Sequence, residues 1–216
     1  MSYLKRQKMP KSWPIPRKGK TYVVSPYSGL KNGLPLLIIL RDILKIAKNR
    51  NEAKKAIKSK LILLNGKEVF EERSLVCLFD TLSIVPSKKS YRMVLSEKGK
   101  FMIEEIKENE SLKKISKIIN KKMIGGEKIQ INLMDGRNVL SNIKAKVNDS
   151  VVFSFKEKKI EKILPLKEGV NVLVFAGKHA GKKSMIDKVD NKKKMVELKL
   201  NDKPTQVLIK QLIVME

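Results

Sequence analysis

The stretch from Gly177 to Ser184 carries residue types that could hold a nucleotide phosphate, because two glycines are followed by lysines and a hydroxyl. In a P-loop, G-x-x-x-x-G-K-[ST], backbone N–H groups and the lysine bind the phosphates and the hydroxyl binds magnesium. Here only three residues separate Gly177 from Gly181, and Lys183 occupies the hydroxyl position. No aspartate follows a buried strand as a second metal ligand. The spacing argues against nucleotide hydrolysis and favours a basic glycine loop that approaches an RNA backbone.

Other reactive residues are scarce. His179 is the only histidine, so neither a catalytic triad nor a two-histidine zinc site can be built around a histidine pair. Cys77 is the only cysteine, which excludes an intrachain disulfide and a cysteine metal cage and fits a reducing, intracellular setting. We therefore expect no enzyme, no cofactor, no metal and no small-molecule substrate. The remaining acidic cluster, interpreted as a solvated helix face or acidic loop, comprises Glu104, Glu105, Glu108 and Glu110.

The charge balance indicates a polyanionic partner. Lysine and arginine total 48 against 22 acidic residues, a formal net charge of +26. Such an excess favours nucleic acid, with an anionic membrane surface as the weaker option. Lysine predominates, which suits phosphate contacts more than base reading, although A/T-rich codon usage gives the same bias. The longest apolar run, Leu34–Leu40, is far below the roughly 20 residues of a membrane span, and no targeting segment is recognisable.

The chain is 42% hydrophobic, enough to build folded cores. We expect an α+β, multi-domain protein: a small helix-pair and β RNA-binding domain, a mostly β central domain, and a small SH3-like β-barrel. The expected segments are a basic arm at 1–33, the RNA-binding domain at 34–100, the central domain at 101–165 and the barrel at 166–216.

The N-terminal arm combines basic side chains with prolines that stand too close together for a helix. Its few apolar residues predict an extended segment that becomes ordered on RNA. Trp13 and Tyr22 are available to stack on bases, and an alternative for Trp13 is packing on the following domain. The candidate RNA-binding residues of the arm are Lys5, Arg6, Lys11, Trp13, Arg17, Lys18 and Lys20.

The second segment is expected to form two helices and then a small sheet. Pro35 suits the first turn of a helix whose apolar stripe has spacings of three and four residues. Asn51 is expected to cap the second helix. Strands are predicted at 61–64 and 81–85, with a tight turn at Asn65-Gly66 after the first. The stripe of the first helix comprises Leu37, Leu40, Leu44 and Ala47.

The third and fourth segments are mostly β in pattern. A short basic helix is predicted from Leu112 to Met123, ended by Gly125-Gly126. Asp135-Gly136 is a strong hairpin turn. Alternation of apolar and polar residues predicts the strands 129–133, 139–143, 151–155, 160–164, 170–174, 185–189, 195–200 and 206–209.

Two parts of the chain resemble known RNA-binding elements. Two basic helices followed by Leu63 to Val69 resemble the alpha-L RNA-binding domain, whose helix pair holds RNA backbone in a basic groove. By that resemblance, the candidates for phosphate contact are Arg41, Lys45, Lys48, Lys54, Lys55, Lys58 and Lys67. The stretch 169–189 resembles a KOW motif, although Ser184 stands where a third glycine is common. The basic loop of this motif contributes the candidates Lys178, His179, Lys182 and Lys183.

The order of these parts is similar to the S-four-e family of small-subunit ribosomal proteins, in its archaeal form. The motifs that carry the resemblance are Leu4-Lys5-Arg6, Pro10-Lys11-Ser12-Trp13, Leu34-Pro35-Leu36, Leu40-Arg41-Asp42, Asn65-Gly66-Lys67, Phe79 to Ile84, Val147 to Ser150 and the KOW stretch. Two departures are Ser28 to Lys31, in place of a Gly-Pro-His step, and Asn65, in place of a common aspartate.

The resemblance implies a structural constituent of the small ribosomal subunit in the cytoplasm. Its partners would be small-subunit rRNA and neighbouring ribosomal proteins, with no membrane contact. Two alternatives stay open: a KOW-containing transcription or translation factor that acts off the ribosome, and an RNA-modifying enzyme with an alpha-L domain. The second would need a catalytic Asp in an Arg-Leu-Asp setting and a large catalytic domain, neither of which is found in the sequence.

Overall fold

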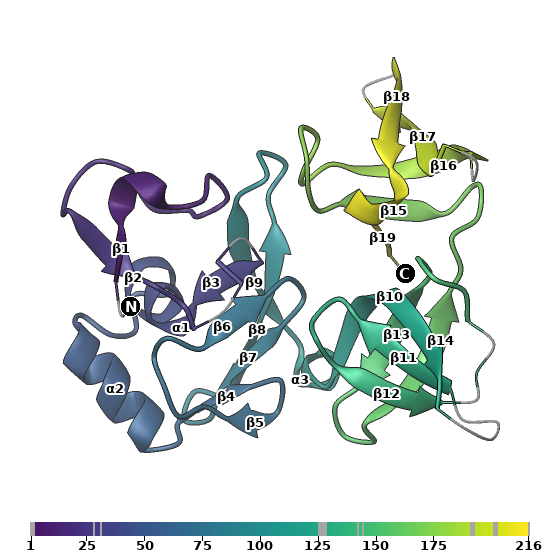
Figure 1. Cartoon of the computed structure of the whole chain (residues 1–216). Coiled ribbons are helices and arrows are strands. Elements are labelled where there is room, and N and C mark those ends of the chain that lie inside the picture. The colour runs from purple at the N-terminus through teal and green to yellow at the C-terminus, as the bar shows by residue number, and fades with distance from the viewer. Residues whose placement is uncertain are drawn as a thin grey trace. The chain divides into compact units, whose positions relative to one another are not determined.

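The computed structural model describes residues 3–27, 29–30, 32–124, 129–141, 143, 145–190, 193–200 and 203–215. The chain is mostly β and separates into two compact units (Figure 1). The N-terminal unit consists of Met1–Ser96 and Lys100–Leu112, and the C-terminal unit of Glu97–Gly99 and Lys113–Glu216. Two features of the sequence lie outside the described residues: Ser28 and Lys31, in the segment that departs from the family's Gly-Pro-His step, and the expected helix end at Gly125-Gly126.

The N-terminal segment is folded, which corrects the expectation of an extended arm. Strands β1 (Tyr3–Lys5) and β2 (Tyr22–Val24) pair antiparallel, and the 3-10 turn η1 (Arg6–Lys8) follows β1. Met9, Trp13 and Val23 are buried. The backbone N–H of Phe101 donates to the carbonyl of Ser12 at 2.8 Å, which ties the loop to a strand of the same unit. The burial of these apolar side chains contributes to folding a segment that seemed too polar for a core.

The first predicted helix is shorter than its apolar stripe. After β3 (Gly33–Pro35), α1 (Leu36–Ile38) runs into a π-helical turn, η2 (Ile39–Ile43), in which Leu44 N–H donates to the carbonyl of Ile39. Lys45 then adopts a positive φ of 54°, which ends the helix. Leu37, Leu40 and Ala47 are buried as expected, but Ala47 lies beyond the helix.

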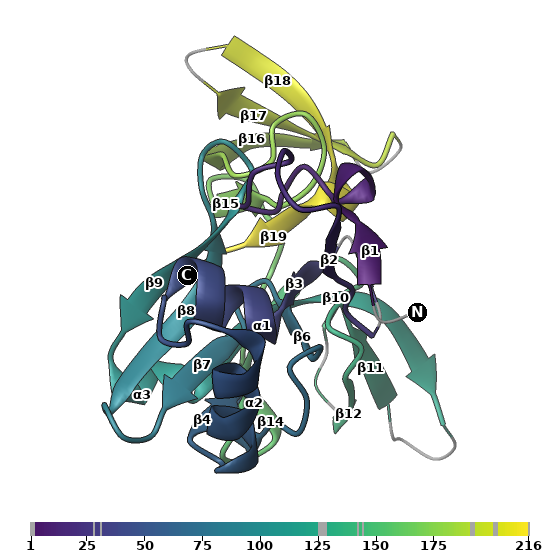
Figure 2. The ribbon, with the colours of Figure 1, turned by 90° about the vertical axis from the view of Figure 1, so that its left-hand side faces the viewer.

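The second helix, α2 (Arg50–Lys58), begins two residues earlier than expected. Asn49 is its N-cap, and its side chain accepts a hydrogen bond from Glu52 N–H at 2.9 Å. The Glu52 carboxylate accepts from the N–H of Lys48, the residue before the cap, at 2.6 Å, and so also fixes the chain where it enters the helix. The structure therefore contradicts the expectation that Asn51 caps the helix. Ala53 and Ile57 form the buried side of α2, which lies beside α1 (Figure 2).

Replacing Asn49 with alanine is expected to lower the free energy of unfolding by about 1 kcal/mol, because the first turn loses its side-chain acceptor. Asn51 is exposed inside the helix and provides the matched control. Asn51→Ala should be neutral or slightly stabilising, since alanine is the better helix former. Urea unfolding of both variants measures the difference. An equal or larger loss for Asn51→Ala would contradict the assignment of the cap.

A five-stranded antiparallel sheet completes the N-terminal unit, in the order β5-β4-β7-β8-β9. Its strands are β4 (Ile62–Leu64), β5 (Lys67–Glu68), β7 (Thr81–Ile84), β8 (Lys89–Leu95) and β9 (Phe101–Ile106). Asn65 and Gly66 both have positive φ, which confirms the predicted tight turn. The two-stranded pair β3-β6 (Leu75–Cys77) lies beside it, and the short helix α3 (Glu108–Ser111) packs on β7 and β8.

The C-terminal unit begins with a strand where a basic helix was predicted. β10 (Lys113–Met123) is paired on both sides in the sheet β12-β11-β10-β13-β14. A register shift between Ile118 and Asn120 interrupts its two-residue alternation. The spacing of Ile115, Ile118 and Ile119 therefore imitates one face of a helix, which explains the wrong prediction. The other strands are β11 (Ile129–Leu133), β12 (Asn138–Ser141), β13 (Ser150–Ser154) and β14 (Lys159–Leu164).

The second sheet of this unit has the order β18-β17-β16-β15-β19, with all neighbours antiparallel. Its strands are β15 (Asn171–Val174), β16 (Lys183–Asp190), β17 (Met195–Leu200), β18 (Lys203–Leu208) and β19 (Leu212–Val214), with the 3-10 turn η3 (Ile209–Gln211) before β19. Its apolar core, which includes Val172, Val196 and Leu198, continues into Val152 and Leu164 of the first sheet.

Two lysines of β10 are buried in this unit. Lys114 forms an ion pair with Asp135 at 3.0 Å, and their side chains are only 2% and 8% exposed. Arg137 lies 3.6 Å from the same carboxylate and over the ring of Phe155 at 4.6 Å. Lys117 instead donates to two backbone carbonyls, those of Ile209 and Leu212. These contacts fasten the β11–β12 turn and η3 to β10.

Candidate nucleic-acid interface

The N-terminal hairpin presents lysines on a scaffold held by arginines. Arg6 donates to the carbonyls of Lys20 and Pro16 at 2.7 and 2.6 Å, and Arg17 donates to the carbonyl of Met9 at 2.9 Å. Both guanidinium groups therefore order the loop, which leaves only part of each for a phosphate. The candidate residues that are exposed here are Lys5, Lys11, Arg17, Lys18 and Lys20.

Trp13 is 1% exposed, so it cannot stack on a base while the segment is folded. This burial favours the alternative, that Trp13 packs on the following domain. Tyr22 is about half exposed and contacts Tyr3 edge-on, with ring centroids 4.8 Å apart. Tyr3 was not among the expected residues, because its pairing with Tyr22 depends on the register of β1 and β2.

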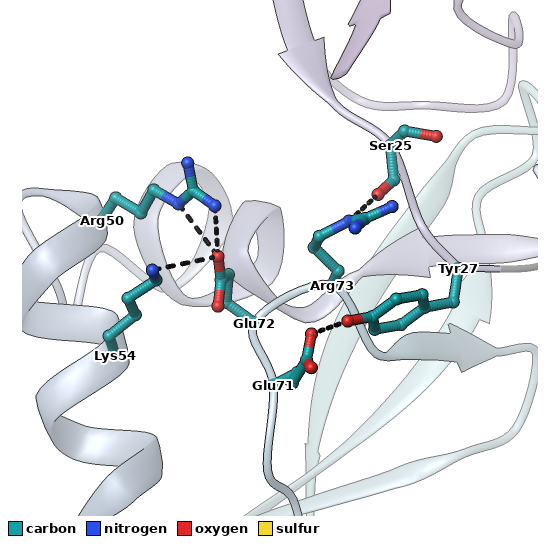
Figure 3. A network of polar contacts seen from close by, with 7 residues as sticks. All are labelled: Ser25, Tyr27, Arg50, Lys54, Glu71, Glu72 and Arg73. Carbon is teal, nitrogen blue, oxygen red and sulfur yellow. Dashed lines mark hydrogen bonds and ion pairs between the residues drawn. The ribbon is translucent and has the colours of Figure 1, made fainter. Parts of the chain in front are cut away.

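Acidic residues occupy part of the basic face of α2. Arg50 donates through Nε and Nη2 to one carboxylate oxygen of Glu72, at 2.9 and 2.6 Å, and Lys54 lies 3.8 Å from that oxygen (Figure 3). Arg50 was not among the expected residues, and Lys54 was expected to contact phosphate. Lys55 and Lys58 are exposed; Lys58 lies one turn after Lys54 on the same face of the helix, and Lys55 lies on the neighbouring face. The free positive charge of α2 is thus concentrated on Lys55 and Lys58.

Glu72 remains ionised despite its burial. Burial disfavours the charged form, but the hydrogen bonds from Arg50 and its own backbone, together with the charges of Arg50 and Lys54, keep the pKa of this carboxyl below its ordinary value. The neighbouring loop is bound to residues 25–27 (Figure 3). Tyr27 donates to Glu71, which raises the pKa of the phenol, and Arg73 lies over the Tyr27 ring at 4.4 Å.

The remaining candidates of the N-terminal unit follow the helix turn. Arg41 pairs with its neighbour Asp42 at 2.8 Å, which reduces its charge toward a phosphate. Lys45 and Lys48 are exposed on the connection between the helices, and Lys67 is exposed on β5. Lys45 and Lys48 therefore lie beyond the helical turn that carries Arg41.

The glycine loop of the C-terminal unit joins β15 to β16. Gly177 and Gly181 both have a φ of 92°, and a Cβ on Gly177 would come within 2.9 Å of the Gln211 side chain. Gly181 N–H donates to the carbonyl of Val174 at 2.7 Å, which closes the loop. Lys178 and Lys183 are exposed, and His179 and Lys182 are half-buried. The loop displays cations on a glycine-rich backbone turn.

The candidates thus fall into separate groups within each unit. The described residues contain no cluster of three His, Cys, Asp or Glu side chains that could hold a metal ion. In the described part of the chain, no helix is long and apolar enough to cross a membrane. What the arrangement can do chemically is bind phosphates through exposed lysines and bases through exposed tyrosines.

Comparison with known proteins identifies the family. Residues 87–160 match the Ribosomal family S4e, and residues 3–29 match the RS4NT (NUC023) domain. The small ribosomal subunit protein eS4 of Methanocella arvoryzae is 38% identical over 183 residues, which cover 83% of this chain and 77% of that protein. This chain belongs to the ribosomal S4e family.

Other members of the S4e family agree in sequence and fold. The small ribosomal subunit protein eS4 of Methanothermobacter thermautotrophicus is 38% identical over 191 residues, which cover 87% of this chain and 79% of that protein. The crystal structure of the 30S ribosomal protein S4e from Thermoplasma acidophilum superimposes on this chain with a TM-score of 0.74 at 25% sequence identity. The superposition covers 86% of this chain and 95% of the Thermoplasma chain. The resemblance inferred from sequence motifs is confirmed.

Proposed function

We propose that this protein is a structural constituent of the small ribosomal subunit that binds rRNA and neighbouring ribosomal proteins in the cytoplasm and catalyses no reaction. The observation that carries the proposal is membership of the S4e family, whose eS4 relatives are named as small-subunit proteins. The net charge of +26 supports it, because a polyanion relieves the mutual repulsion of so many cations.

Within this function, we propose the organisation expected from the sequence: a basic segment at 1–33, an alpha-L RNA-binding domain at 34–100, a β-rich central domain at 101–165 and a KOW-type SH3-like barrel at 166–216. Two helices followed by the β4–β5 hairpin support the alpha-L assignment. Five antiparallel strands with a glycine loop between β15 and β16 support the KOW assignment. These two elements would hold RNA backbone through Lys48, Lys55 and Lys58 and through Lys178 and Lys183.

The alternatives make different predictions for native subunits. We expect the protein to stay with the small subunit at stoichiometric level when lysate is fractionated on a sucrose gradient in high salt. A KOW-containing factor acting off the ribosome would wash off and run free or with polymerase, which would overturn the proposal. An RNA-modifying enzyme with an alpha-L domain has no supporting observation in the described residues.

Replacing Lys48, Lys55 and Lys58 together with alanine is expected to weaken binding to small-subunit rRNA about 10- to 100-fold near 100 mM salt. Each lost phosphate contact should reduce the slope of log affinity against log salt by about 0.7–0.9. Filter binding over a salt series measures both quantities. The S4e fold offers a matched control in the β13–β14 hairpin, where Lys156, Lys158 and Lys159 are also exposed.

The control removes the same charge from a place outside the candidate interface. It should change the affinity only slightly and leave most of the salt slope intact. If both triple variants lose affinity and slope equally, binding depends on net charge alone and the assignment of α2 as a phosphate-binding element fails.

A further inference from the structure

The solvent face of the N-terminal hairpin carries two tyrosines that contact each other. Strands β1 and β2 form a two-stranded pair of their own (Figure 1). The register places Lys5 opposite Tyr22, and Tyr3 lies two residues before Lys5 on the same face. Tyr3 and Tyr22 are therefore diagonal neighbours whose rings can reach each other. Leu4 and Val23 form the opposite face, and Val23 is buried.

Both rings of this tyrosine pair, Tyr3 and Tyr22, keep open aromatic surface. Tyr3 is 54% exposed and Tyr22 is 53% exposed, although their ring centroids lie only 4.8 Å apart, at an interplanar angle of 68°. In such an edge-on pair the edge of one ring meets the face of the other, so each ring keeps a face that its partner does not cover. An aromatic face that is open to solvent can take a stacked base of any type.

The backbone that carries the tyrosine pair is already fixed by contacts within the hairpin. Arg6 N–H donates to the carbonyl of Thr21 at 2.9 Å, which continues the pairing of β1 and β2 by one residue beyond Lys5. The Arg6 guanidinium donates to the carbonyls of Lys20 and Pro16. Binding to a preformed site loses little conformational entropy, so the gain from stacking would not be offset by the ordering of a loop.

The charge around the tyrosine pair suits a phosphate. The first 41 residues of the chain contain nine lysines and arginines and no aspartate or glutamate. Lys5 is exposed on the face of the pair, and Lys20 is exposed two residues before Tyr22. In the described part of the chain, no side chain of residues 3–24 pairs with a carboxylate. The positive charge beside the rings is therefore available to an anionic ligand.

We propose that the tyrosine pair holds an unpaired nucleotide of RNA, whose base stacks on a tyrosine ring while its phosphate lies toward Lys5. A nucleotide joins a flat aromatic group to an anion, which is the combination that this face offers to bind. The bases of an RNA duplex are stacked on each other, whereas unpaired bases can stack on tyrosine. The inference rests on the proposed function, which supplies the RNA, and adds the kind of nucleotide and the residues that bind it.

The test uses the full-length protein in assembled small subunits. Ultraviolet irradiation should attach a nucleotide at Tyr3 or Tyr22, detected by mass spectrometry, and reverse transcription should place that nucleotide in an unpaired part of the rRNA. Ribose acylation of the same nucleotide should rise about fivefold or more in the double variant Tyr3→Ile/Tyr22→Ile, because the base loses its stack. Tyr3→Phe/Tyr22→Phe keeps both rings and should leave the reactivity at the wild-type level.

The isoleucine variant separates stacking on RNA from packing within the hairpin. Isoleucine favours strands and fills the same face but has no aromatic ring. Trp13, the only tryptophan of the chain, is buried in this segment, so its fluorescence reports whether the segment stays folded. Its emission maximum should be the same in the wild type and in both double variants. If the isoleucine variant shifts to the red, the wild-type adducts and the phenylalanine variant decide the proposal.

Other outcomes distinguish this inference from the proposed function. An absence of adducts at both tyrosines, an adduct to a nucleotide within a duplex, or equal reactivity in wild-type and folded isoleucine subunits would overturn the stacking site while the ribosomal function stands. If the wild-type chain does not sediment with small subunits, the proposed function fails, and with it the source of the RNA. Irradiation of the free chain with a short oligouridylate would then support the site by an adduct at either tyrosine and overturn it by the lack of one.

Discussion

Replacing Asp135 with alanine is expected to lower the free energy of unfolding of the C-terminal unit by about 3–5 kcal/mol. The Asp135 carboxylate lies 3.0 Å from the Lys114 ammonium, where water reaches neither side chain well. Removing the carboxylate takes this countercharge from a buried cation, and the remaining contacts of Lys114 must then hold the charge alone. Arg137, which is 3.6 Å from the same carboxylate, loses an anchor as well.

The exposed pair between Lys199 and Asp187, at 3.1 Å, is the matched control in the same unit. Asp187→Ala should cost no more than about 1 kcal/mol, because solvent screens an exposed pair. Asp135→Asn keeps the size of the side chain, and its loss in the free energy of unfolding should fall between those of the other two variants. This value separates the effect of the charge from the effect of the turn. Urea unfolding monitored by circular dichroism gives the three values. A loss for Asp135→Ala no greater than that of the control would contradict a stabilising buried pair.

The stability of the C-terminal unit is expected to rise between about pH 8 and pH 10.5 because of Lys117. Burial lowers the pKa of Lys117 from 10.5 to about 8, and two backbone carbonyls accept from its Nζ. Below pH 8 both folded and unfolded states hold the proton. Between pH 8 and 10.5 the unfolded state keeps a proton that the folded state has released, so the free energy of unfolding increases with pH, by up to about 3 kcal/mol.

Comparison with Lys117→Met isolates this effect, since the variant retains all other titrating groups. The wild-type free energy of unfolding minus that of the variant should increase over the stated range and level off above it. Lys188→Met, at an exposed position on β16, should run parallel to the wild type at every pH. Parallel profiles for wild type and Lys117→Met would show that the folded state does not release this proton.

Strands with strict alternation could be predicted from the sequence, and β11, β13 and β17 lie where their apolar residues indicated. β10 could not be predicted, because its bulge between Ile118 and Asn120 breaks the alternation locally and its partners come from elsewhere in the chain. Strands β8 and β9 were not predicted, because polar and apolar residues are mixed along their faces and no clear alternation marks them as strands outside the sheet.

For the candidate interface, the sequence indicates where positive charge lies but not which charges are already engaged. Lys54 faces Glu72 from a position 18 residues away in sequence, and Arg6 reaches Pro16 and Lys20. Such partners are decided by tertiary packing, which no local pattern reports. The burial of Trp13 could not be predicted either, because the loop that carries it is tied to β9, far along the chain, by the hydrogen bond from Phe101 N–H to the Ser12 carbonyl.

The hairpin held by Arg6 also bears on the energetics of assembly. A disordered basic tail loses about 1–2 kcal/mol of backbone entropy for every residue that becomes fixed on RNA. Residues 3–27 have lost that freedom when the chain folds, since Arg6, Arg17 and the buried Trp13 fix the loop. The binding free energy of this hairpin on rRNA should therefore come mainly from counterion release. The heat-capacity change should be small, in contrast to the large negative change that accompanies folding on binding.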